Sequence, residues 1–587
     1  MAELNVSKKT VKQILDRQGW KYVVPRYQRP YSWDDDPTLA LWNDILDFFQ
    51  EIKTDQYSDR HYYLGCIVTI ENAADRQIEI IDGQQRLTSL LLLLRAIYVR
   101  ISGMTSTPAV DGQKRQIESC IWNLDPVTQQ IADVNCVRLE TLSTKPGGEL
   151  PLSTILTTGN ILTGDKSRYG RNYSLFMEKY QQFVQDEPQF WDRLVNVILN
   201  HCVVIPIECC NIDEALRIFN TLNNRGTPLS DADIFKSELY RIYSLSGNEN
   251  VFMAQWNELD SIATDARMGI SDLFRYYAYT MKSQEIASDH AANPSSTVDA
   301  SSIGKEIDLR KFYLEGSVKK IGSPNLMSDV LDLGRFWQSI NDDAENYDQK
   351  YLTPRAKRLL HCLTIYPNIN WRRVVSVYFF ALQKDANAIK AGFEDLLSRL
   401  LSYLCVRYIN KPGVDAIRLG IAKACVEVME QQTVSNVLSE NIQPMAFTDK
   451  LKPEGFVAEK LTKTLIVLNA YLADPNGTSL IPANFNVEHI LPRKWQAANY
   501  NGWSHTTAEK EGWLESLGNK IPFEKKLNIQ AGNGFFAQKK TKYVLSGIKE
   551  VKDLANLNQD DWLKADVVRR LDEMTARLCN FFMTNLA

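Results

Sequence analysis

The longest apolar run of the chain, Leu87 to Val99, places the strongest constraint on how this polypeptide can fold. It is interrupted by Arg95 and is shorter than the roughly 20 residues that a helix needs to cross a bilayer. A helix that is apolar all round has to be surrounded by protein, so Leu87–Ile101 predicts a buried helix inside a globular domain. The N-terminus carries charges throughout and has no apolar core of a secretory signal. We therefore expect a cytoplasmic protein that does not enter a membrane.

Segments rich in β-branched and aromatic residues indicate strands before and after this helix. They are His61–Ile70, Arg76–Asp82 and Cys202–Cys209. Residues 141–172 are rich in Gly, Ser, Thr and Pro, which predicts a loop or an insertion. The N-terminal third is therefore expected to be a mixed α/β domain.

The rest of the chain has a different pattern. Leu229–Leu472 is predicted to be mostly helical, with a surface loop at Ser288–Lys305. Short strands and turns follow around Phe485–Ser546, and a closing helix is expected from about Trp562 to Phe582. At about 100–200 residues per domain, the 587 residues predict a multidomain α+β protein. Its parts are an α/β domain at 1–235, a helical linker domain at 236–450 and an α+β domain at 451–587.

Charge and cysteine content limit the class of protein. The formal net charge is −4, so a nucleic-acid-binding surface has to be a local patch and not a property of the whole chain. The ten cysteines include no C-x-x-C pair, which argues against a disulfide framework or a thiolate zinc site. We expect reduced thiols, as in the cytoplasm.

A group of residues near the C-terminus indicates phosphodiester chemistry. Glu488 and His489 lie on a predicted strand, and Asn519 precedes Asn528 by nine positions. This is the layout of a ββα-metal nuclease finger, of the His-Me or HNH-like kind. His489 would deprotonate the water that attacks phosphorus, because imidazole changes its charge near neutral pH. Asn519 would orient the imidazole through its side chain or its backbone carbonyl.

The same pattern predicts a metal site. Asn528 and Glu488 would hold one divalent cation, Mg²⁺ or Mn²⁺, through oxygen atoms, and that ion would neutralise charge on the phosphate. For His489 alone, a structural role is the alternative, and Gly518-Asn519 alone would be a simple turn. Only the combination of these residues favours a nuclease.

The segment around this pattern is basic. From Asn484 to Lys549 there are ten Lys and Arg residues and five Glu residues, a local net charge of 10 − 5 = +5. Such lysines would contact DNA phosphates, although a solvated lysine face is the alternative for each of them. The candidates are Lys525, Lys526, Lys539, Lys540 and Lys542.

A second pattern joins a predicted strand to the buried helix through a glycine. Its residues are Asp82, Gly83, Gln84, Gln85 and Arg86. A helix N-terminus offers free N–H groups, glycine lets an anion approach, and Arg86 suits phosphate oxygens. The pattern therefore predicts a nucleotide-phosphate site, with a plain structural turn as the alternative. The chain has no G-x-x-x-x-G-K-[ST] motif, so it is not expected to be a P-loop enzyme.

Several longer motifs surround these residues. In the C-terminal part they are E-H-I-L-P from Glu488, L-G-N from Leu517, L-N at Leu527 and F-x-x-K-K-x-x-Y-x-x-S from Phe536 to Ser546. In the N-terminal part they are V-P-R-Y-Q-R-P-Y-S-W at Val24–Trp33, D-G-Q-Q-R at Asp82–Arg86 and F-N-T-L-N-N-R-G-T-P-L at Phe219–Leu229. Together they resemble the GmrSD family of type IV, modification-dependent restriction enzymes. The chain departs from that family at Lys520, where a leucine is usual, and we expect an effect on packing or on a phosphate contact.

The resemblance implies a single chain that joins a sensor to a nuclease. The N-terminal domain of the family is similar to the ParB/sulfiredoxin-like fold, in which a comparable G-x-x-R binds nucleotide. It therefore implies that the D-G-Q-Q-R residues bind and hydrolyse a nucleoside triphosphate: GTP, ATP or another. The residues implied to line the same cleft are Arg26, Gln28 and Arg29.

Three aromatic residues lie beside these arginines, namely Tyr27, Tyr31 and Trp33. They would stack on a flipped modified base of DNA, and packing in a small core is the alternative. The combined hypothesis is a nucleotide-regulated, metal-dependent endonuclease that cleaves modified double-stranded phage DNA, with a homodimer as a nucleotide-dependent state. The alternatives are a nucleotide-dependent reader of modified DNA and a partner-regulated RNase or toxin that uses the same finger.

Overall fold

The computed structural model describes most of the chain in two compact units, Met1–Asn257 and Glu258–Ala587. The described residues are 8–55, 58–142, 150–211, 214–215, 218, 230–293, 300–341, 349–413, 415–433, 437–440, 442–498, 500 and 502–586. Both helices and strands are present, so the α+β class is confirmed. Within the described residues no helix is both long and apolar enough to cross a membrane.

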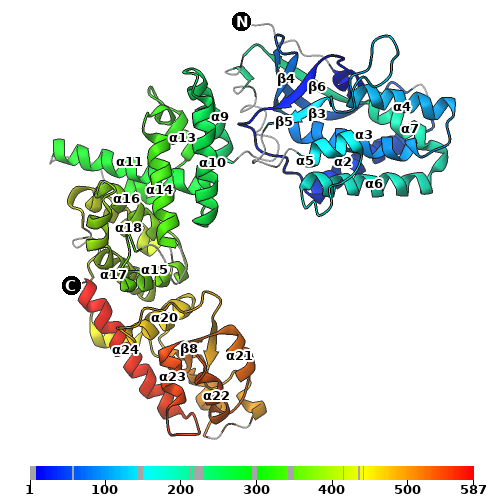
Figure 1. The fold of residues 1–587 in the computed structure, drawn as a ribbon. Coiled ribbons are helices and arrows are strands. Elements are labelled where there is room, and N and C mark those ends of the chain that lie inside the picture. Colours follow the sequence, from blue (N-terminus) through cyan, green and yellow to red (C-terminus); the bar gives the residue numbers. More distant parts are fainter. Residues whose placement is uncertain are drawn as a thin grey trace. The chain divides into compact units, whose positions relative to one another are not determined.

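The first unit contains a mixed six-stranded sheet (Figure 1). In spatial order its strands are β1 (Lys9–Thr10), β6 (Cys202–Cys209), β3 (Tyr62–Asn72), β4 (Gln77–Asp82), β2 (Lys21–Val24) and β5 (Leu139–Thr141). β3 pairs with β4 antiparallel, whereas β2 and β4 run parallel. The strands predicted at residues 61–70, 76–82 and 202–209 are confirmed as β3, β4 and β6.

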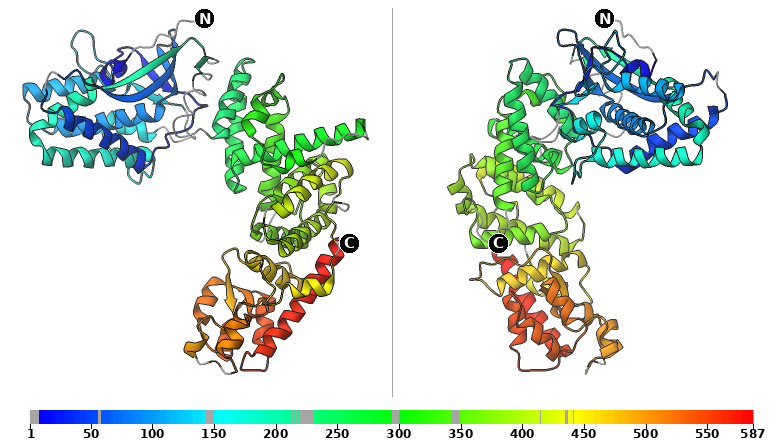
Figure 2. Two further views of the ribbon diagram at one scale, coloured as in Figure 1. Left: turned by 180° about the vertical axis from the view of Figure 1, so that it is seen from behind. Right: turned by 45° about the vertical axis from the view of Figure 1, so that its right-hand side comes forward.

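Helices cover one side of this sheet, as the views in Figures 1 and 2 show. They are α1 (Val11–Leu15), α2 (Asp35–Ile52), α3 (Gln84–Ser102), α4 (Pro108–Ile121), α5 (Leu150–Thr158), α6 (Arg168–Asp186) and α7 (Trp191–Asn196). Apolar residues of α3 and of strands such as β4 share one buried core. The unit continues with α9 (Asp231–Ser244) and the start of α10 (Glu249–Asp265).

The predicted buried helix is confirmed as α3. Gly83 begins it with φ +89°, and a Cβ there would lie 2.9 Å from the Ile67 side chain and 3.2 Å from the Cys66 carbonyl oxygen. Glycine is therefore required both by the left-handed backbone and by the close approach of β3. The buried Arg95 donates hydrogen bonds to the carbonyls of Ile155 and Leu156 near the end of α5. The Arg95 side chain of α3 thus provides hydrogen-bond donors for carbonyl groups at the C-terminal end of α5.

The loop predicted at residues 141–172 is only partly correct. α5 lies within it, and α6 begins at Arg168 with the Ser167 side chain as its N-cap. Tyr173, Phe176, Tyr180 and Phe183 follow at helical spacing and are buried. The small polar residues at the start of the segment do not predict a helix from composition alone, because tertiary packing stabilises it.

The second unit begins with a helical region. Its helices are α11 (Ile270–Ala292), α12 (Ser301–Gly304), α13 (Leu309–Leu314), α14 (Leu326–Asn341), α15 (Pro354–Ile365), α16 (Trp371–Ala381), α17 (Ala386–Asn410), α18 (Asp415–Gln431), α19 (Pro444–Asp449) and α20 (Thr462–Leu472). The mostly helical pattern is confirmed. The loop predicted at 288–305 is wrong at both ends, because α11 extends to Ala292 and α12 begins at Ser301.

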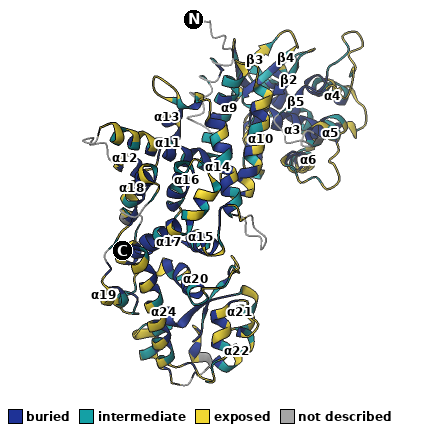
Figure 3. Ribbon diagram, turned by 60° about the vertical axis from the view of Figure 1, so that its left-hand side comes forward, coloured by how far each residue is buried: buried dark blue, intermediate teal, exposed yellow. Residues whose placement is uncertain are grey.

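The C-terminal part of this unit returns to mixed structure. It contains β7 (Asn486–His489), β8 (Lys520–Phe523), α21 (Lys525–Ala531), α22 (Phe536–Tyr543), α23 (Lys549–Ala555) and α24 (Lys564–Leu586). α24 has one buried and one exposed face (Figure 3), and it packs against α17 and α20. The helical region and the C-terminal part lie in one compact unit, Glu258–Ala587, and a domain boundary near residue 450 stays a prediction.

Candidate active site

The antiparallel pair of β7 and β8 positions the predicted general base. Its register pairs His489 with Lys520 and Glu488 with Ile521. Successive residues of a strand point to opposite faces, and accordingly Glu488 is only 4% exposed, whereas His489 is half-buried. α21 follows β8 and carries Asn528.

Two side chains of α22 hold the Glu488 carboxylate. Lys539 Nζ donates to Glu488 Oε1 at 2.6 Å, and Tyr543 Oη donates to the same oxygen at 2.7 Å. Residues at positions i and i+4 share one helix face, which explains the spacing of the K-K-x-x-Y motif. Lys539 Nζ also donates to the backbone carbonyls of His489, at 2.7 Å, and Ile490. α22 therefore supports both the carboxylate and the backbone that carries the base.

Burial determines the electrostatics of this group. Desolvation lowers the pKa of Lys539 against the opposing effect of Glu488, and it raises the pKa of Tyr543 well above its usual value. The Tyr543 hydroxyl therefore stays protonated and donates to Glu488 at all physiological pH values.

Two of the lysines predicted to bind DNA have structural roles instead. Lys539 is 1% exposed and its ammonium group makes its hydrogen bonds inside the protein. Lys540 donates to the carbonyl oxygens of Leu557 and Gln559 at 3.0 and 2.7 Å, which ties α22 to the segment after α23. Three of the predicted lysines remain accessible: the exposed Lys525 and Lys526 and the half-buried Lys542.

Asn519 holds backbone segments and does not orient the His489 ring, contrary to our prediction. Its Oδ1 accepts a hydrogen bond from Leu491 N at 2.8 Å, and its Nδ2 donates to the carbonyls of Leu491 at 3.0 Å and Leu514 at 2.9 Å. Its own carbonyl accepts from Ile490 N. Both amide hydrogens are thereby used, and the side chain is fully buried.

The ring of His489 contacts Glu515, a residue that the sequence pattern did not single out. His489 Nε2 lies 3.2 Å from Glu515 Oε2. The same oxygen lies 2.7 Å from Lys520 Nζ, and Glu515 Oε1 accepts from Arg493 Nε at 3.0 Å. Glu515 lies in the stretch between His489 and the L-G-N motif, where no spacing rule connects an acidic residue to the histidine.

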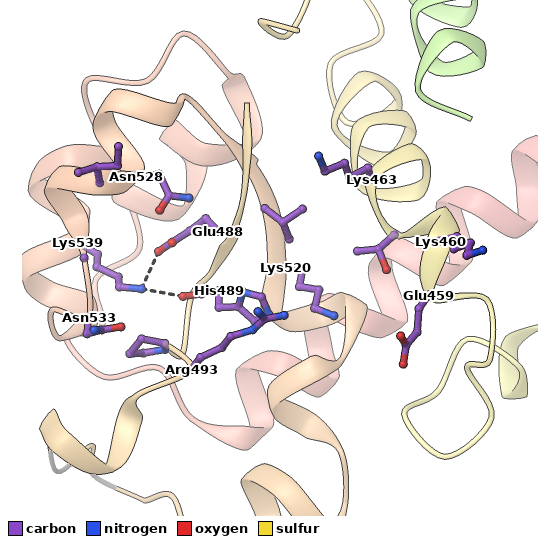
Figure 4. Close-up of a pocket in the computed structure, with 15 residues that line it drawn as sticks. Glu459, Lys460, Lys463, Glu488, His489, Arg493, Lys520, Asn528, Asn533 and Lys539 are labelled. Carbon is purple, nitrogen blue, oxygen red and sulfur yellow. Dashed lines mark hydrogen bonds and ion pairs between the residues drawn. The ribbon is translucent and has the colours of Figure 1, made fainter. Parts of the chain in front are cut away.

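His489 and Glu488 line an open cavity of about 660 Å³. Figure 4 shows Asn528 and Lys539 on one side of it, and Lys460 and Lys463, at the start of α20, on the other. Five Lys or Arg residues but only two Glu residues line the cavity. Its surplus of positive charge suits an anionic polymer. The sequence did not indicate that Lys460 and Lys463 belong to this site, because they precede the nuclease motif and lie on another element.

The predicted metal ligands Glu488 and Asn528 both line this cavity. Oε1 of Glu488 is taken by Lys539 and Tyr543, which leaves Oε2 and the Asn528 amide oxygen as donors. Within the described residues, no group of three or more His, Cys, Asp or Glu side chains could hold a metal ion. Glu488 Oε2 and the Asn528 amide oxygen are oxygen donors of the type that Mg²⁺ binds, and Mg²⁺ takes most of its other ligands from water and phosphate.

In the first unit, three glutamines predicted to bind nucleotide are used inside the protein. Gln85 Oε1 accepts from Ser32 N at 2.7 Å and from Trp33 N at 3.2 Å. Gln84 Nε2 donates to the Arg29 carbonyl at 3.1 Å. The third, Gln28, donates from Nε2 to the Ile81 carbonyl at 3.0 Å. All three are buried, so their amides hold the segment before α2 against the start of α3.

The charged residues of the predicted nucleotide site remain more accessible. Arg86 Nη1 donates to the Cys66 carbonyl at 3.1 Å, and its guanidinium lies against Gly65. Burial raises the pKa of Asp82, while the Gly83 N–H and the charges of Arg86 and Arg29 act in the opposite direction. Arg26 is exposed and Arg29 is half-buried. The other predicted motif of this region, Phe219–Leu229, lies outside the described residues.

The aromatic residues predicted to stack on DNA bases belong to the core. Tyr27 is 2% exposed and packs on Tyr240 of α9, with 4.6 Å between ring centroids. Tyr31 stacks on Tyr169, and its hydroxyl bonds Ser89. The third, Trp33, is partly buried against the same core. Tyr27 and Tyr31 cannot receive a flipped base, so the alternative of core packing is correct for them.

Two family models match segments near the two ends of the chain. Residues 11–240 match the N-terminal domain of GmrSD restriction endonucleases, and residues 445–577 match their C-terminal domain. The chain belongs to the GmrSD family. No curated protein matches it closely enough to count as a relative. As a GmrSD-family type IV restriction enzyme it is a DNA endonuclease of antiviral defence, and DNA is its substrate.

The site of this GmrSD protein predicts a large effect of Lys539→Met on stability. The substitution leaves the Glu488 carboxylate buried without its partner, and breaking a buried pair in this way costs about 3–5 kcal/mol. Lys525→Met, at an exposed position of α21, is expected to change stability by less than about 0.5 kcal/mol. Calorimetry of the full chain measures both. Wild-type stability of Lys539→Met together with weaker DNA binding would instead support the original DNA-binding assignment.

Proposed function

We propose that this chain is a nucleotide-regulated, metal-dependent endonuclease that cleaves modified foreign double-stranded DNA. One observation carries the nuclease assignment: a single cationic cavity collects His489, the two oxygen donors Glu488 and Asn528, and lysines from β8, α22 and the start of α20. The family supplies the restriction activity. The ββα-metal and ParB-like subfolds remain predictions, and the pairing of β7 with β8 before α21 supports the first.

His489 is proposed as the general base. It accepts a proton from water while the water oxygen forms a bond to phosphorus, and the bond from phosphorus to the leaving oxygen breaks. A base must lie within reach of its substrate, and His489 lines the cavity. Glu488 has a different role, because its Oε1 is held by Lys539 and Tyr543, which leaves only Oε2 as a donor in the cavity that it shares with His489.

Glu488 and Asn528 would hold a divalent cation such as Mg²⁺ or Mn²⁺. When bound, the ion supplies positive charge next to the phosphate and the leaving oxygen. The protein contributes two oxygen donors and a rigid carboxylate, since Lys539 and Tyr543 prevent Glu488 from rotating freely.

DNA is proposed to pass between the finger and the start of α20. Lys460 and Lys463 on one side and Arg493 and Lys520 on the other line the cavity. Lysine and arginine contacts to phosphates position a duplex without reading its sequence. Such binding suits a nuclease whose choice of substrate depends on a modification that is recognised elsewhere in the protein.

We propose that the first unit binds a nucleoside triphosphate through the cations near the start of α3, with Arg86 as the main contact and Arg26 and Arg29 beside it. Arg26 is exposed, Arg29 and Arg86 are half-buried, and the charges of Arg29 and Arg86 both act on the Asp82 carboxyl, which supports this assignment. The nucleotide regulates cleavage only if it binds one arrangement of the protein more tightly than another, and such coupling is typically about 1–3 kcal/mol. A nucleotide-dependent homodimer is one such arrangement.

The first prediction for this function concerns the base. His489→Ala is expected to lower the cleavage rate by about 10²–10⁴-fold, the usual loss for a general base, with little change in folding. His505→Ala is the control, because that histidine pairs with Glu509, is exposed and does not line the cavity. The assay compares modified phage DNA, matched unmodified DNA and transfer RNA. Cleavage by His489→Ala at the wild-type rate would refute the assignment, and cleavage of RNA alone would favour the RNase.

The second prediction concerns the metal. Dialysis against EDTA is expected to stop cleavage, and Mg²⁺ or Mn²⁺ to restore it, because the candidate ligands are oxygen donors. Asn528→Ala should raise the metal concentration needed for half-maximal rate. Asn533→Ala, which changes an exposed residue of the same cavity, should not. If the EDTA-treated enzyme still cuts DNA, the metal site does not exist.

The third prediction concerns the nucleotide. Arg86→Ala is expected to weaken triphosphate binding and to reduce the dependence of cleavage on DNA modification. Arg100→Ala, at the exposed far end of the same helix, serves as the control. Nucleotide titrations followed by calorimetry and by DNA cleavage measure both effects. Unchanged binding would remove the role of Arg86, and lost binding with unchanged cleavage would show that nucleotide does not regulate the nuclease.

A further inference from the structure

We propose that Glu515 is the positioning residue of the active site: its carboxylate holds the Nε2–H tautomer of His489 and leaves Nδ1 to take the proton from water. This inference rests on the proposed role of His489 as the base. It assigns a function to a residue of the stretch between His489 and the L-G-N motif.

The contact between the two side chains sets the tautomer. Glu515 Oε2 lies 3.2 Å from His489 Nε2. An ionised carboxylate only accepts hydrogen bonds, so Nε2 must carry the hydrogen. In a neutral imidazole the other nitrogen, Nδ1, then has the free lone pair. Within the described residues Nδ1 has no hydrogen-bond partner, and the His489 side chain is only 10% exposed.

Glu515 stays ionised because cations surround it. The hydrogen bond from His489, and then that from Lys520, hold the pKa of this carboxyl far below its usual range, although partial burial acts in the opposite direction. Arg493 Nε donates to the other carboxylate oxygen at 3.0 Å. These contacts restrain the carboxylate from both sides, although the side chain itself is half exposed.

The backbone around Glu515 is fixed by independent contacts. Asn519 Nδ2 donates to the carbonyl of Leu514, the residue before Glu515, at 2.9 Å. Trp513 Nε1 donates to Glu511 Oε2 at 3.1 Å, and Lys564 Nζ of α24 bonds the same oxygen at 2.6 Å. Asn519 therefore acts on the histidine indirectly, because it places the turn that carries Glu515.

The proton transfer uses this arrangement as follows. A water O–H bond breaks, its proton moves to Nδ1, and the water oxygen bonds to phosphorus while the leaving oxygen departs. The imidazole then carries a positive charge with a hydrogen on each nitrogen. Glu515 stabilises that charge through Nε2–H, and so lowers the energy of the state that forms during attack. Hydrogen-bond partners that orient metal-bound histidines typically contribute about 10–100-fold to activity, and we expect an effect of the same order for Glu515.

A competing interpretation is that Glu515 occupies the place of a DNA phosphate. It pairs with Arg493 and Lys520, which line the cavity, so a phosphate would have to displace it. The two interpretations predict opposite changes in turnover. If Glu515 positions the base, its removal lowers kcat; if it blocks the substrate, its removal raises the rate.

The experiment compares Glu515→Gln and Glu515→Asp with the wild-type full chain, using the same modified DNA and metal. Glu515→Gln is expected to lower kcat by about 10–100-fold, while DNA affinity stays equal or rises because a negative charge is lost. Glu515→Asp, which keeps the charge, should recover part of the rate. The matched control is Glu509→Gln, since Glu509 lies in the same segment and also pairs with a histidine, His505, away from the cavity.

A double-mutant cycle separates this inference from the proposed function. In the His489→Ala background, Glu515→Gln should cause no further loss of rate, because the two residues act as one unit. Wild-type kcat in Glu515→Gln, or a rise, with His489→Ala inactive overturns the positioning role alone. An active His489→Ala overturns the proposed function itself. Thermal unfolding of each variant confirms that the comparison concerns folded protein.

Discussion

The buried ion pair of Lys539 and Glu488 is the interaction on which the active site depends. Neither side chain is accessible, with 0% and 5% exposure, so each charge needs the other to remain inside the protein. The same ammonium group binds the carbonyls of His489 and Ile490. Strand β7, helix α22 and the segment that carries the base are therefore held together at one point. The position of the base therefore depends on the buried ion pair that its neighbour in the strand, Glu488, makes with Lys539.

A second set of contacts places the backbone beside this point. Arg570 of α24 donates to the carbonyls of Gly518 at 3.0 Å and Lys520 at 2.9 Å, and it pairs with the buried Glu550. Gly518 allows the close approach of α24, since a Cβ there would lie 2.3 Å from the Val567 carbonyl oxygen. In the L-G-N motif, Gly518 therefore allows α24 to pack closely, and Asn519 hydrogen-bonds backbone groups. Helix α24 therefore helps to hold the backbone of the active site in place.

The first unit uses its family motifs in a similar way. The amides of Gln28, Gln84 and Gln85 bind backbone groups, and Gly83 makes room for β3. Most of the D-G-Q-Q-R residues therefore build the junction between β4 and α3, which leaves Arg86 as the motif residue with a charge suited to a phosphate. The residues of a family motif can therefore be required by the fold as well as by a ligand.

The sequence alone determined the residue types of the site and the local elements that carry them. The apolar composition of Leu87–Ile101 required a buried helix, and α3 confirms it. β-branched residues at Cys202–Cys209 predicted β6 with correct bounds, because strand composition is a local property. His489, Glu488 and Asn528 were selected from their spacing, and they line one cavity.

Only the tertiary structure decided what each polar side chain touches. Lys539 and Lys525 look alike in a basic segment, yet one is buried against Glu488 and the other is exposed. Tyr27 lies beside arginines in the sequence but packs on Tyr240, more than 200 residues away in the chain. Glu515 meets His489 only because β7 pairs with β8 and the intervening segment folds back. Burial and long-range pairing depend on how distant elements pack, and local sequence does not contain that information.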